Sequence, residues 1–224
     1  MERQIFWDNG HHLGDPGARH KSYSENEMTI ELGNKLLYAL RDDFGTIRMV
    51  PDNLNLASSI DFVNQSARPD DFAVSVHFNA HSDTSVSGTE VYYSDLEEKR
   101  IAEVFARHIS KALFIPNRGA RPDRWTWVGS LGWLRKLKCN SILVETCYLT
   151  SDSDMGKYTP ERALVGFYEA LSEIYPPTAS KPVLRQSGLS EIQLHALKEF
   201  IYQFLKDKVS PEKVKEVLDL IKGK

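Results

Sequence analysis

The chain has 224 residues, of which 41% are hydrophobic and 26% charged, and its formal net charge is −3. This composition is typical of a globular protein, and it argues against a nucleic-acid partner because a phosphate-backbone binder needs clustered Lys and Arg. The two cysteines, Cys139 and Cys147, are too few for a disulfide framework or a cysteine zinc site.

Strand-like and helix-like patterns alternate through residues 1–175. In chain order, the sequence predicts a strand at 5–7, a helix over 28–40, a strand at 46–50, a helix over 57–67, strands at 72–77 and 88–93, helices over 97–113 and 131–137, a strand at 141–149 and a helix over 160–174. Strands interleaved with helices favour an α/β fold: a three-layer domain with a mixed, mostly parallel central sheet and helices on both faces.

The end of the chain has a different character. Residues 176–187 are rich in Pro, Ser and Thr and lack periodicity, which is typical of a linker. Ser190 and Ser210 then each open a capped helix, so residues 188–224 are expected to form a small C-terminal helical hairpin. Such a hairpin buries little core alone, so it packs on the preceding domain, pairs with a partner or binds a ligand.

The N-terminus leads directly into the first strand, with no basic region followed by an apolar run. No later stretch is apolar over the length that a bilayer requires. We therefore expect a protein that is synthesised in the cytoplasm without a signal peptide and does not insert into membranes. We also expect it to be a monomer.

Three of the predicted strands run into residue types that bind metals. The first leads to Asp8 and His11, the strand at 72–77 ends on His77, and the strand at 141–149 contains Glu145. Ligands of open α/β sheets bind beyond the carboxyl ends of the strands, so these side chains are expected to converge there. This convergence predicts an enzyme.

Four blocks of sequence carry a family resemblance. Residues 8–18, DNGHHLGDPGA, resemble the opening motif of zinc-dependent N-acetylmuramoyl-L-alanine amidases of the amidase-3 type. Residues 75–82, SVHFNAHS, are similar to the second histidine block of that family, residues 88–93, GTEVYY, to the strand after it, and residues 143–150, LVETCYLT, to the catalytic-glutamate block. The chain departs from the family at Asn9, where proline is usual, and at His12 and Leu13, which replace a glycine pair. His12 is therefore a rival of His11 for the role of the first histidine.

Zinc is the cofactor that the resemblance implies. His11 and His77 are expected as ligands because each ends an apolar strand beside a turn. By contrast, His20, His108 and His195 are interpreted as structural histidines.

The third ligand is chosen among Glu25, Glu27 and Glu31. With Ser24 as N-cap, Glu27 falls in a Ser-x-x-Glu capping box, and Glu31 precedes Lys35 by one helical turn, so both have structural roles. Glu25 stands at the first helical position and matches the ligand glutamate of the family. Its alternative role is to complement the helix dipole.

Glu145 is the expected catalytic residue. Its neighbours on the same face of the strand, Leu143, Cys147 and Leu149, are apolar, and such surroundings raise the pKa of a carboxyl group toward the range of a general base. The alternative is a structural ion pair with a basic residue such as Arg135. Two histidines and one carboxylate leave zinc an open position for water, as in catalytic sites.

A further set of residues is expected to contact substrate. His12 and His81 follow the ligand candidates closely, and three tryptophans lie in a glycine-punctuated segment before the last strand, although at least one of them is equally explained as a core residue. The full set is His12, Asn79, His81, Trp125, Trp127, Trp133 and Arg135. The turn at Asp15, Pro16 and Gly17 is interpreted as a rigid support for His11.

The resemblance implies hydrolysis of the amide between N-acetylmuramic acid and L-alanine of peptidoglycan. We expect a zinc amidase catalytic domain at 1–175, a linker at 176–187 and a candidate cell-wall-targeting hairpin at 188–224. The expected setting is a phage or prophage lysis enzyme, a bacteriolytic endolysin that reaches the wall after holin-type release. The alternatives are a zinc peptidase that cuts within the stem peptide, and a non-catalytic wall-binding module.

Overall fold

The computed structural model describes residues 3–12, 14–40 and 43–176, together with positions 210, 212, 213 and 215. The chain divides into two compact units, Met1–Ala179 and Ser180–Lys224. The predicted linker and hairpin lie almost entirely outside the described residues, so they stay predictions. The following concerns the first unit.

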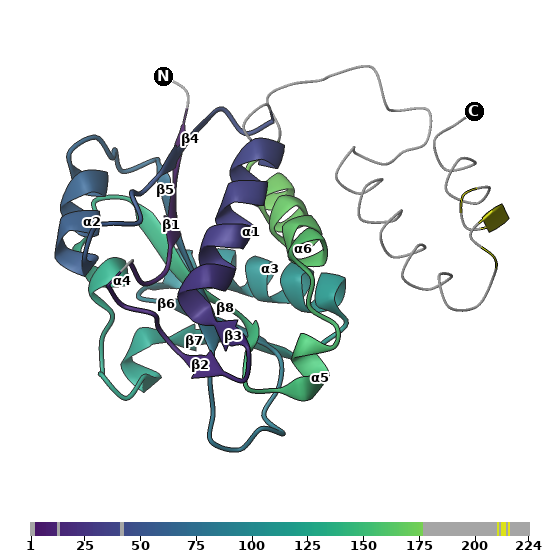
Figure 1. The fold of residues 1–224 in the computed structure, drawn as a ribbon. Coiled ribbons are helices and arrows are strands. Elements are labelled where there is room, and N and C mark those ends of the chain that lie inside the picture. Colours follow the sequence, from purple (N-terminus) through teal and green to yellow (C-terminus); the bar gives the residue numbers. More distant parts are fainter. Residues whose placement is uncertain are drawn as a thin grey trace. The chain divides into compact units, whose positions relative to one another are not determined.

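A six-stranded sheet forms the centre of this unit, with strand order β4-β1-β5-β8-β6-β7 (Figure 1). Its strands are β1 (Gln4–Asn9), β4 (Thr46–Met49), β5 (Phe72–Asn79), β6 (Thr89–Tyr93), β7 (Asn117–Pro122) and β8 (Asn140–Tyr148). The strands β4, β1, β5 and β8 are parallel, whereas β6 runs antiparallel to β8, and β7 is parallel to β6. The predicted mixed, mostly parallel sheet is confirmed.

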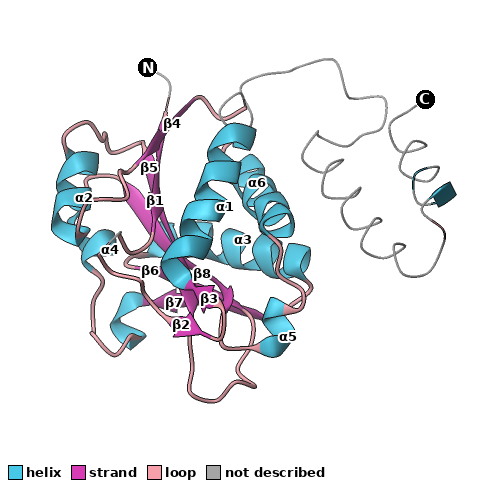
Figure 2. Cartoon of the chain, viewed as in Figure 1, coloured by secondary structure: helices cyan, strands magenta, loops and turns pink. Residues whose placement is uncertain are grey.

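Helices cover both faces of the sheet (Figure 2). They are α1 (Glu25–Leu40), α2 (Leu56–Asn64), α3 (Leu96–Leu113), α4 (Gly132–Lys136), α5 (Asp152–Met155) and α6 (Pro160–Ile174). On one face α6 packs against α1 and α3, and on the other α2 packs against α4. The three-layer architecture predicted from the sequence is therefore also confirmed.

Local sequence explains where the helices begin. Thr159 caps α6 by accepting a hydrogen bond from the backbone amide of Arg162, and Pro160 occupies the first turn, as predicted. Asp95 caps α3 by accepting from the amides of Glu97 and Glu98. The core includes side chains that are at most 2% exposed from β1, α1, β5, α3 and α6: Phe6, Trp7, Leu32, Leu36, Phe72, Phe105 and Phe167.

Two short elements precede α1 and prepare its position. The strands β2 (Arg19–His20) and β3 (Tyr23–Ser24) form a small antiparallel ladder, and α1 starts at the next residue.

None of the described helices combines the length and apolar character needed to cross a bilayer.

Candidate active site

Three side chains from separate elements meet at the carboxyl ends of the parallel strands. His11 follows β1, Glu25 opens α1, and His77 lies near the end of β5. His11 Nε2 lies 2.9 Å from Glu25 Oε2, and His77 Nδ1 lies 3.0 Å from Glu25 Oε1. One nitrogen or oxygen from each residue lies within 4.8 Å of the others, the only such cluster found in the described part of the chain. The structure therefore brings together the three predicted ligands.

Backbone amides fix both oxygens of Glu25. The amide of Ala18 donates to Oε2 at 2.8 Å, and the amide of Phe78 donates to Oε1 at 3.0 Å. The predicted capping box is absent, because no contact joins Ser24 and Glu27 among the described residues, and the Glu27 side chain is exposed. Glu25 is thus held by tertiary contacts with the preceding loop and with β5.

The turn after β1 supports His11, as the sequence predicts. The Nδ1 atom of His11 lies 3.0 Å from Asp15 Oδ2, and the other oxygen of Asp15 accepts from the amide of Gly17 at 3.1 Å. His11 has a φ of 71°, in the left-handed region that is uncommon for residues other than glycine. This backbone conformation and the Asp15 contact leave the Nε2 atom of His11 facing Glu25.

A second hydrogen-bond chain orients His77. The hydroxyl of Ser75 donates to Asp8 Oδ2 at 2.6 Å and lies 3.1 Å from His77 Nε2. Since the single hydroxyl proton goes to Asp8, Ser75 accepts from an N–H at Nε2 of His77. The Nδ1 atom of His77 then faces Glu25, 3.0 Å from its Oε1 atom. From the sequence, Asp8 was expected only to lie near the site and Ser75 was not singled out, although both residues lie in the quoted blocks.

Electrostatics within the cluster are strong. Burial raises the pKa of Glu25, but hydrogen bonds from His11 and His77 outweigh burial, and the pKa lies well below its usual range. Burial lowers the pKa of His11, whereas the carboxylates of Glu25 and Asp15 raise it, with a net value of about 9. The cluster therefore combines an ionised carboxylate with two imidazole groups that lie within hydrogen-bond distance of it.

Glu145 lies on the neighbouring strand. It is paired with His77 in the register of β5 and β8, and its Oε2 atom is buried with no hydrogen-bond partner in the part of the chain that the structure describes. Burial, then the nearby charges of Glu25 and Glu90, raise the pKa of Glu145 well above its usual value. The alternative pairing with Arg135 is wrong, because Arg135 binds Asp123 through contacts of 2.6 and 2.7 Å.

A buried carboxylate next to Glu145 was missed by the sequence analysis. Glu90 is 5% exposed. Its Oε1 atom accepts from the side-chain amide of Asn79 at 2.8 Å and from the hydroxyls of Tyr92 and Tyr148 at 3.0 and 3.2 Å. Its other oxygen accepts from Arg118 Nε at 2.8 Å. The signal was its place in the GTEVYY block, but only the pairing of β6 with β8 shows that it adjoins Glu145.

The structure corrects the assignment of Trp133 and gives Arg135 a structural partner. Trp133 is 2% exposed and packs in the hydrophobic core with Phe6, Val50 and Leu143, so it does not line an open surface. The guanidinium of Arg135 is bound at both ends by Asp123, which is 1% exposed, and this pair ties α4 to the segment before it. Trp133 is thus a core residue, whereas the Arg135 side chain is 45% exposed and its predicted contact with substrate stays a prediction.

The remaining candidates lie nearer the surface. Trp125 is 64% exposed and Trp127 is 97% exposed, both in the segment after β7. Nδ1 of His12 accepts from the amide of Gly14 at 3.1 Å, and Nδ1 of His81 accepts from the amide of Asp83 at 3.0 Å. Each imidazole thus has one nitrogen engaged in a local turn.

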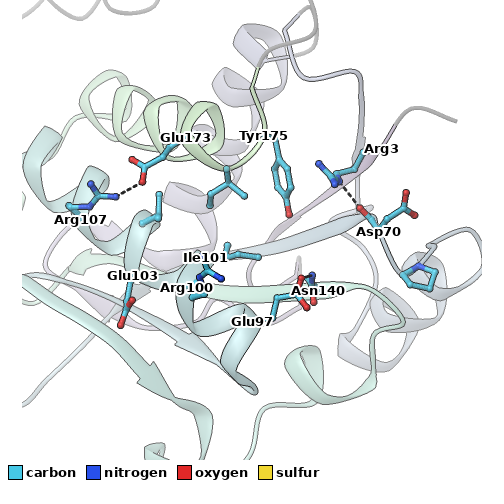
Figure 3. A pocket seen from close by; sticks show the side chains of 13 residues that line it. Arg3, Asp70, Glu97, Arg100, Ile101, Glu103, Arg107, Asn140, Glu173 and Tyr175 are labelled. Carbon is cyan, nitrogen blue, oxygen red and sulfur yellow. Dashed lines mark hydrogen bonds and ion pairs between the residues drawn. The ribbon is translucent and has the colours of Figure 1, made fainter.

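The pocket in Figure 3 lies at the opposite end of the parallel strands from this cluster. Asp70 precedes β5 and Asn140 begins β8, so this pocket is at the amino ends of the parallel strands. Its lining includes neither histidine nor cysteine, and Arg3 lies over the ring of Tyr175 at 4.1 Å. Among the described residues, the candidate metal-binding cluster therefore lies at the other end of the parallel strands, away from this pocket.

Comparisons with known proteins agree with this geometry. The family described as N-acetylmuramoyl-L-alanine amidase, of the amidase-3 type, matches residues 5–171. The N-acetylmuramoyl-L-alanine amidase LytC of Bacillus subtilis is 29% identical over 154 residues, which cover 68% of this chain and 31% of LytC. The chain therefore spans about a third of the length of that relative.

Solved structures show the same fold. Cwp6 from Clostridium difficile has a TM-score of 0.68 and 25% identity, and the match covers 80% of this chain and 30% of Cwp6. The catalytic domain of CwlV, an N-acetylmuramoyl-L-alanine amidase from Bacillus (Paenibacillus) polymyxa, has a TM-score of 0.67 and 21% identity, with 77% of this chain and 97% of the domain covered.

Proposed function

Because this chain belongs to the amidase-3 family of N-acetylmuramoyl-L-alanine amidases, we propose that it hydrolyses the amide between N-acetylmuramic acid and L-alanine in peptidoglycan. The observation that carries the proposal is the convergence of His11, Glu25 and His77 within 4.8 Å of one another beside Glu145. The substrate comes from family membership, and the chemistry comes from the site.

The donor set of the cluster fits zinc. Two imidazoles and one carboxylate are ligands of catalytic zinc sites. Each imidazole is also held at its other nitrogen, His11 by Asp15 and His77 by Ser75, as is usual for histidines that bind metals. Held by His11, Glu25 and His77, zinc would supply Lewis acidity toward the scissile carbonyl and the attacking water.

Glu145 has the properties of the general base. Its buried oxygen lacks a protein partner among the described residues, so it is available to a water molecule, and its raised pKa suits a group that gains and then loses a proton near neutral pH. We assign to it removal of a proton from the attacking water and delivery of that proton to the amine of the departing L-alanine.

Surface residues around the site complete the proposal. We assign substrate contacts to His12, His81, Trp125 and Trp127, because the imidazoles follow the ligand positions and the indoles are exposed after β7. Asn79 contributes indirectly, since its amide holds Glu90.

Product analysis tests the reaction against its alternatives. After digestion of purified peptidoglycan, the amidase reaction leaves an intact stem peptide with a new amino terminus on L-alanine. A stem-peptide peptidase leaves shortened stems on the glycan, and a wall-binding module leaves the peptidoglycan uncut. Mass spectrometry of the soluble products distinguishes the three outcomes.

The remaining parts of the proposal concern setting and organisation. We propose a monomeric lysis enzyme that reaches the wall after holin-type release, with residues 188–224 as a wall-targeting element. The test of the lysis role is whether expressed protein lyses cells only when a holin is co-expressed. For targeting, a truncation after Pro177 should keep activity on soluble muropeptides and lose binding to intact walls. Equal loss of both activities would contradict it.

A further inference from the structure

The edge strand β7 brings two arginines toward the site. In the pairing of β6 with β7, Arg121 is opposite Tyr92, and in the pairing of β6 with β8, Glu90 is opposite Glu145. Tyr92 and Glu90 are two residues apart on β6, so their side chains share a face of the sheet. Arg121 is therefore on the same face as Glu145, and Arg118 joins it there through Glu90.

The carboxylate of Glu90 lies near the guanidinium groups of both Arg118 and Arg121. Arg118 Nε donates to Glu90 Oε2 at 2.8 Å, whereas Arg121 Nε lies 3.9 Å from the same oxygen, too far for a hydrogen bond. Glu90 already accepts three further hydrogen bonds at its other oxygen. The three groups together carry one surplus positive charge.

Arg121 has unused donors. It makes no hydrogen bond to any described residue, and its guanidinium lies 6.0 Å from the ring centroid of Trp125. The side chains of Arg118 and Arg121 are 32% and 35% exposed, so both are accessible from solvent. A pair of planar guanidinium groups with free N–H donors is suited to a carboxylate, which it binds through paired, charge-assisted hydrogen bonds.

We infer that Arg118 and Arg121 form a subsite for a carboxylate of the stem peptide, on the residue that follows L-alanine. This inference rests on the proposed function. Neighbouring strands are about 4.8 Å apart, so the guanidinium of Arg118, which reaches β6, lies roughly one to two strand spacings from Glu145. One residue of an extended peptide spans about 3.5 Å, which places a carboxylate on the second stem residue within that reach when the scissile amide is beside Glu145.

The test compares two muramoyl peptides that differ only at this carboxylate. In one, the residue after L-alanine is glutamate with its α-carboxylate free, and in the other that carboxylate is an amide. Cleavage of each is measured with the full-length, zinc-loaded wild type, with Arg121→Gln and with Arg124→Gln. Arg124 is exposed on the same segment and has no contact with Glu90 among the described residues, so its replacement controls for the loss of one positive charge.

The wild type and Arg124→Gln should prefer the free carboxylate by about tenfold or more in kcat/KM, the size of one charge-assisted hydrogen bond. Arg121→Gln should lose that preference and cleave the amidated peptide as the wild type does. Equal cleavage of both peptides by the wild type, or a preference retained in Arg121→Gln, would overturn the subsite and leave the amidase proposal standing. If the wild type cleaves neither peptide, the amidase proposal fails, and the subsite fails with it.

Discussion

His77 and Glu145 occupy paired positions on the neighbouring parallel strands β5 and β8. Paired residues project to the same side of a sheet, so the register alone sets a proposed metal ligand beside the proposed base. A shift of one residue would turn Glu145 to the opposite face, where α1, α3 and α6 pack. The catalytic arrangement is therefore a direct consequence of how these two strands pair.

The metal ligands give the first prediction. Replacing His11, Glu25 or His77 by Ala should abolish stoichiometric zinc binding, because each change removes one of the three protein ligands that we propose. Glu27→Ala is the matched control, since Glu27 is exposed two residues along the same helix, and it should bind zinc as the wild type does. Metal analysis after dialysis measures both. Zinc loss in Glu27→Ala with retention in Glu25→Ala would reverse the assignment.

The second prediction concerns Glu145. Glu145→Gln keeps the size of the side chain but removes the base, so turnover should fall by roughly 10²- to 10⁴-fold while the zinc content is unchanged. Steady-state rates on soluble muropeptides and metal analysis of the same preparation test this. A fully active Glu145→Gln enzyme would rule out the proposed role.

Gly17 provides a third prediction. A Cβ atom at Gly17 would lie 2.6 Å from both Glu25 Oε2 and the His11 ring, whereas a Cβ at Gly129 would meet nothing within 4 Å. Both glycines have positive φ, 62° and 75°, so Ala at either position incurs a similar backbone strain. Gly17→Ala should therefore weaken zinc binding by roughly 10- to 100-fold, and Gly129→Ala should not. Chelator competition measures this difference, and equal affinities would contradict the packing argument.

The fourth prediction is a pH dependence of the free energy of unfolding that comes from Asp71, at the amino end of β5. Burial raises the pKa of Asp71, but hydrogen bonds from Arg68 and Gln4 outweigh it and lower the pKa to about 2. Because the folded-state pKa is below the unfolded value of about 3.9, the stabilisation is complete above pH ~4 and is lost as the pH falls toward 2. Its size is about 2 kcal/mol.

Asp71→Asn should accordingly lower the free energy of unfolding at pH 7, and the difference from wild type should shrink between pH 4 and 2. Urea denaturation across this range measures it. Asp70→Asn is the control, because the Asp70 side chain is 65% exposed and its pair with Arg68 is 3.9 Å long. A difference for Asp71→Asn that does not change with pH would count against the ionic explanation.

Much of the fold could be predicted because its segments follow simple periodicities. Pro160–Ile174 matches the predicted helix, and the buried strands β5 and β8 match their apolar runs within a few residues. The strand β7 was missed, since NRGARP has no apolar alternation. It forms at the sheet edge through pairing with β6 and packing against α3, and neither interaction is visible in a local pattern.

The site was predictable where it depends on strand ends and unpredictable where it depends on register. His11, His77 and Glu145 stand at or near the ends of apolar strands. Glu25 was selected through the family resemblance. The capping-box argument for Glu27 was wrong, because no hydrogen bond joins Ser24 and Glu27 in the described part of the chain and the Glu27 side chain is exposed.

Residues tied to the site by tertiary contacts could not be placed there from local patterns alone. Glu90 adjoins Glu145 only through the antiparallel pairing of β6 and β8, and Arg118 reaches it from a strand that was not expected. The prediction that Trp133 lines a groove was wrong for a related reason. A tryptophan in a glycine-punctuated segment can point to solvent or to the core, and in this structure Trp133 lies on α4 and packs in the core.

The most direct test of zinc-dependent amide hydrolysis is the appearance of new alanine amino termini in purified peptidoglycan. The full-length protein is assayed as prepared, after chelation, and after zinc is restored to the chelated sample. We predict that alanine termini appear with the untreated enzyme, stop on chelation and return with zinc, while the stem peptides stay intact. Alanine termini that form at an undiminished rate in the chelated, zinc-free protein would contradict the account.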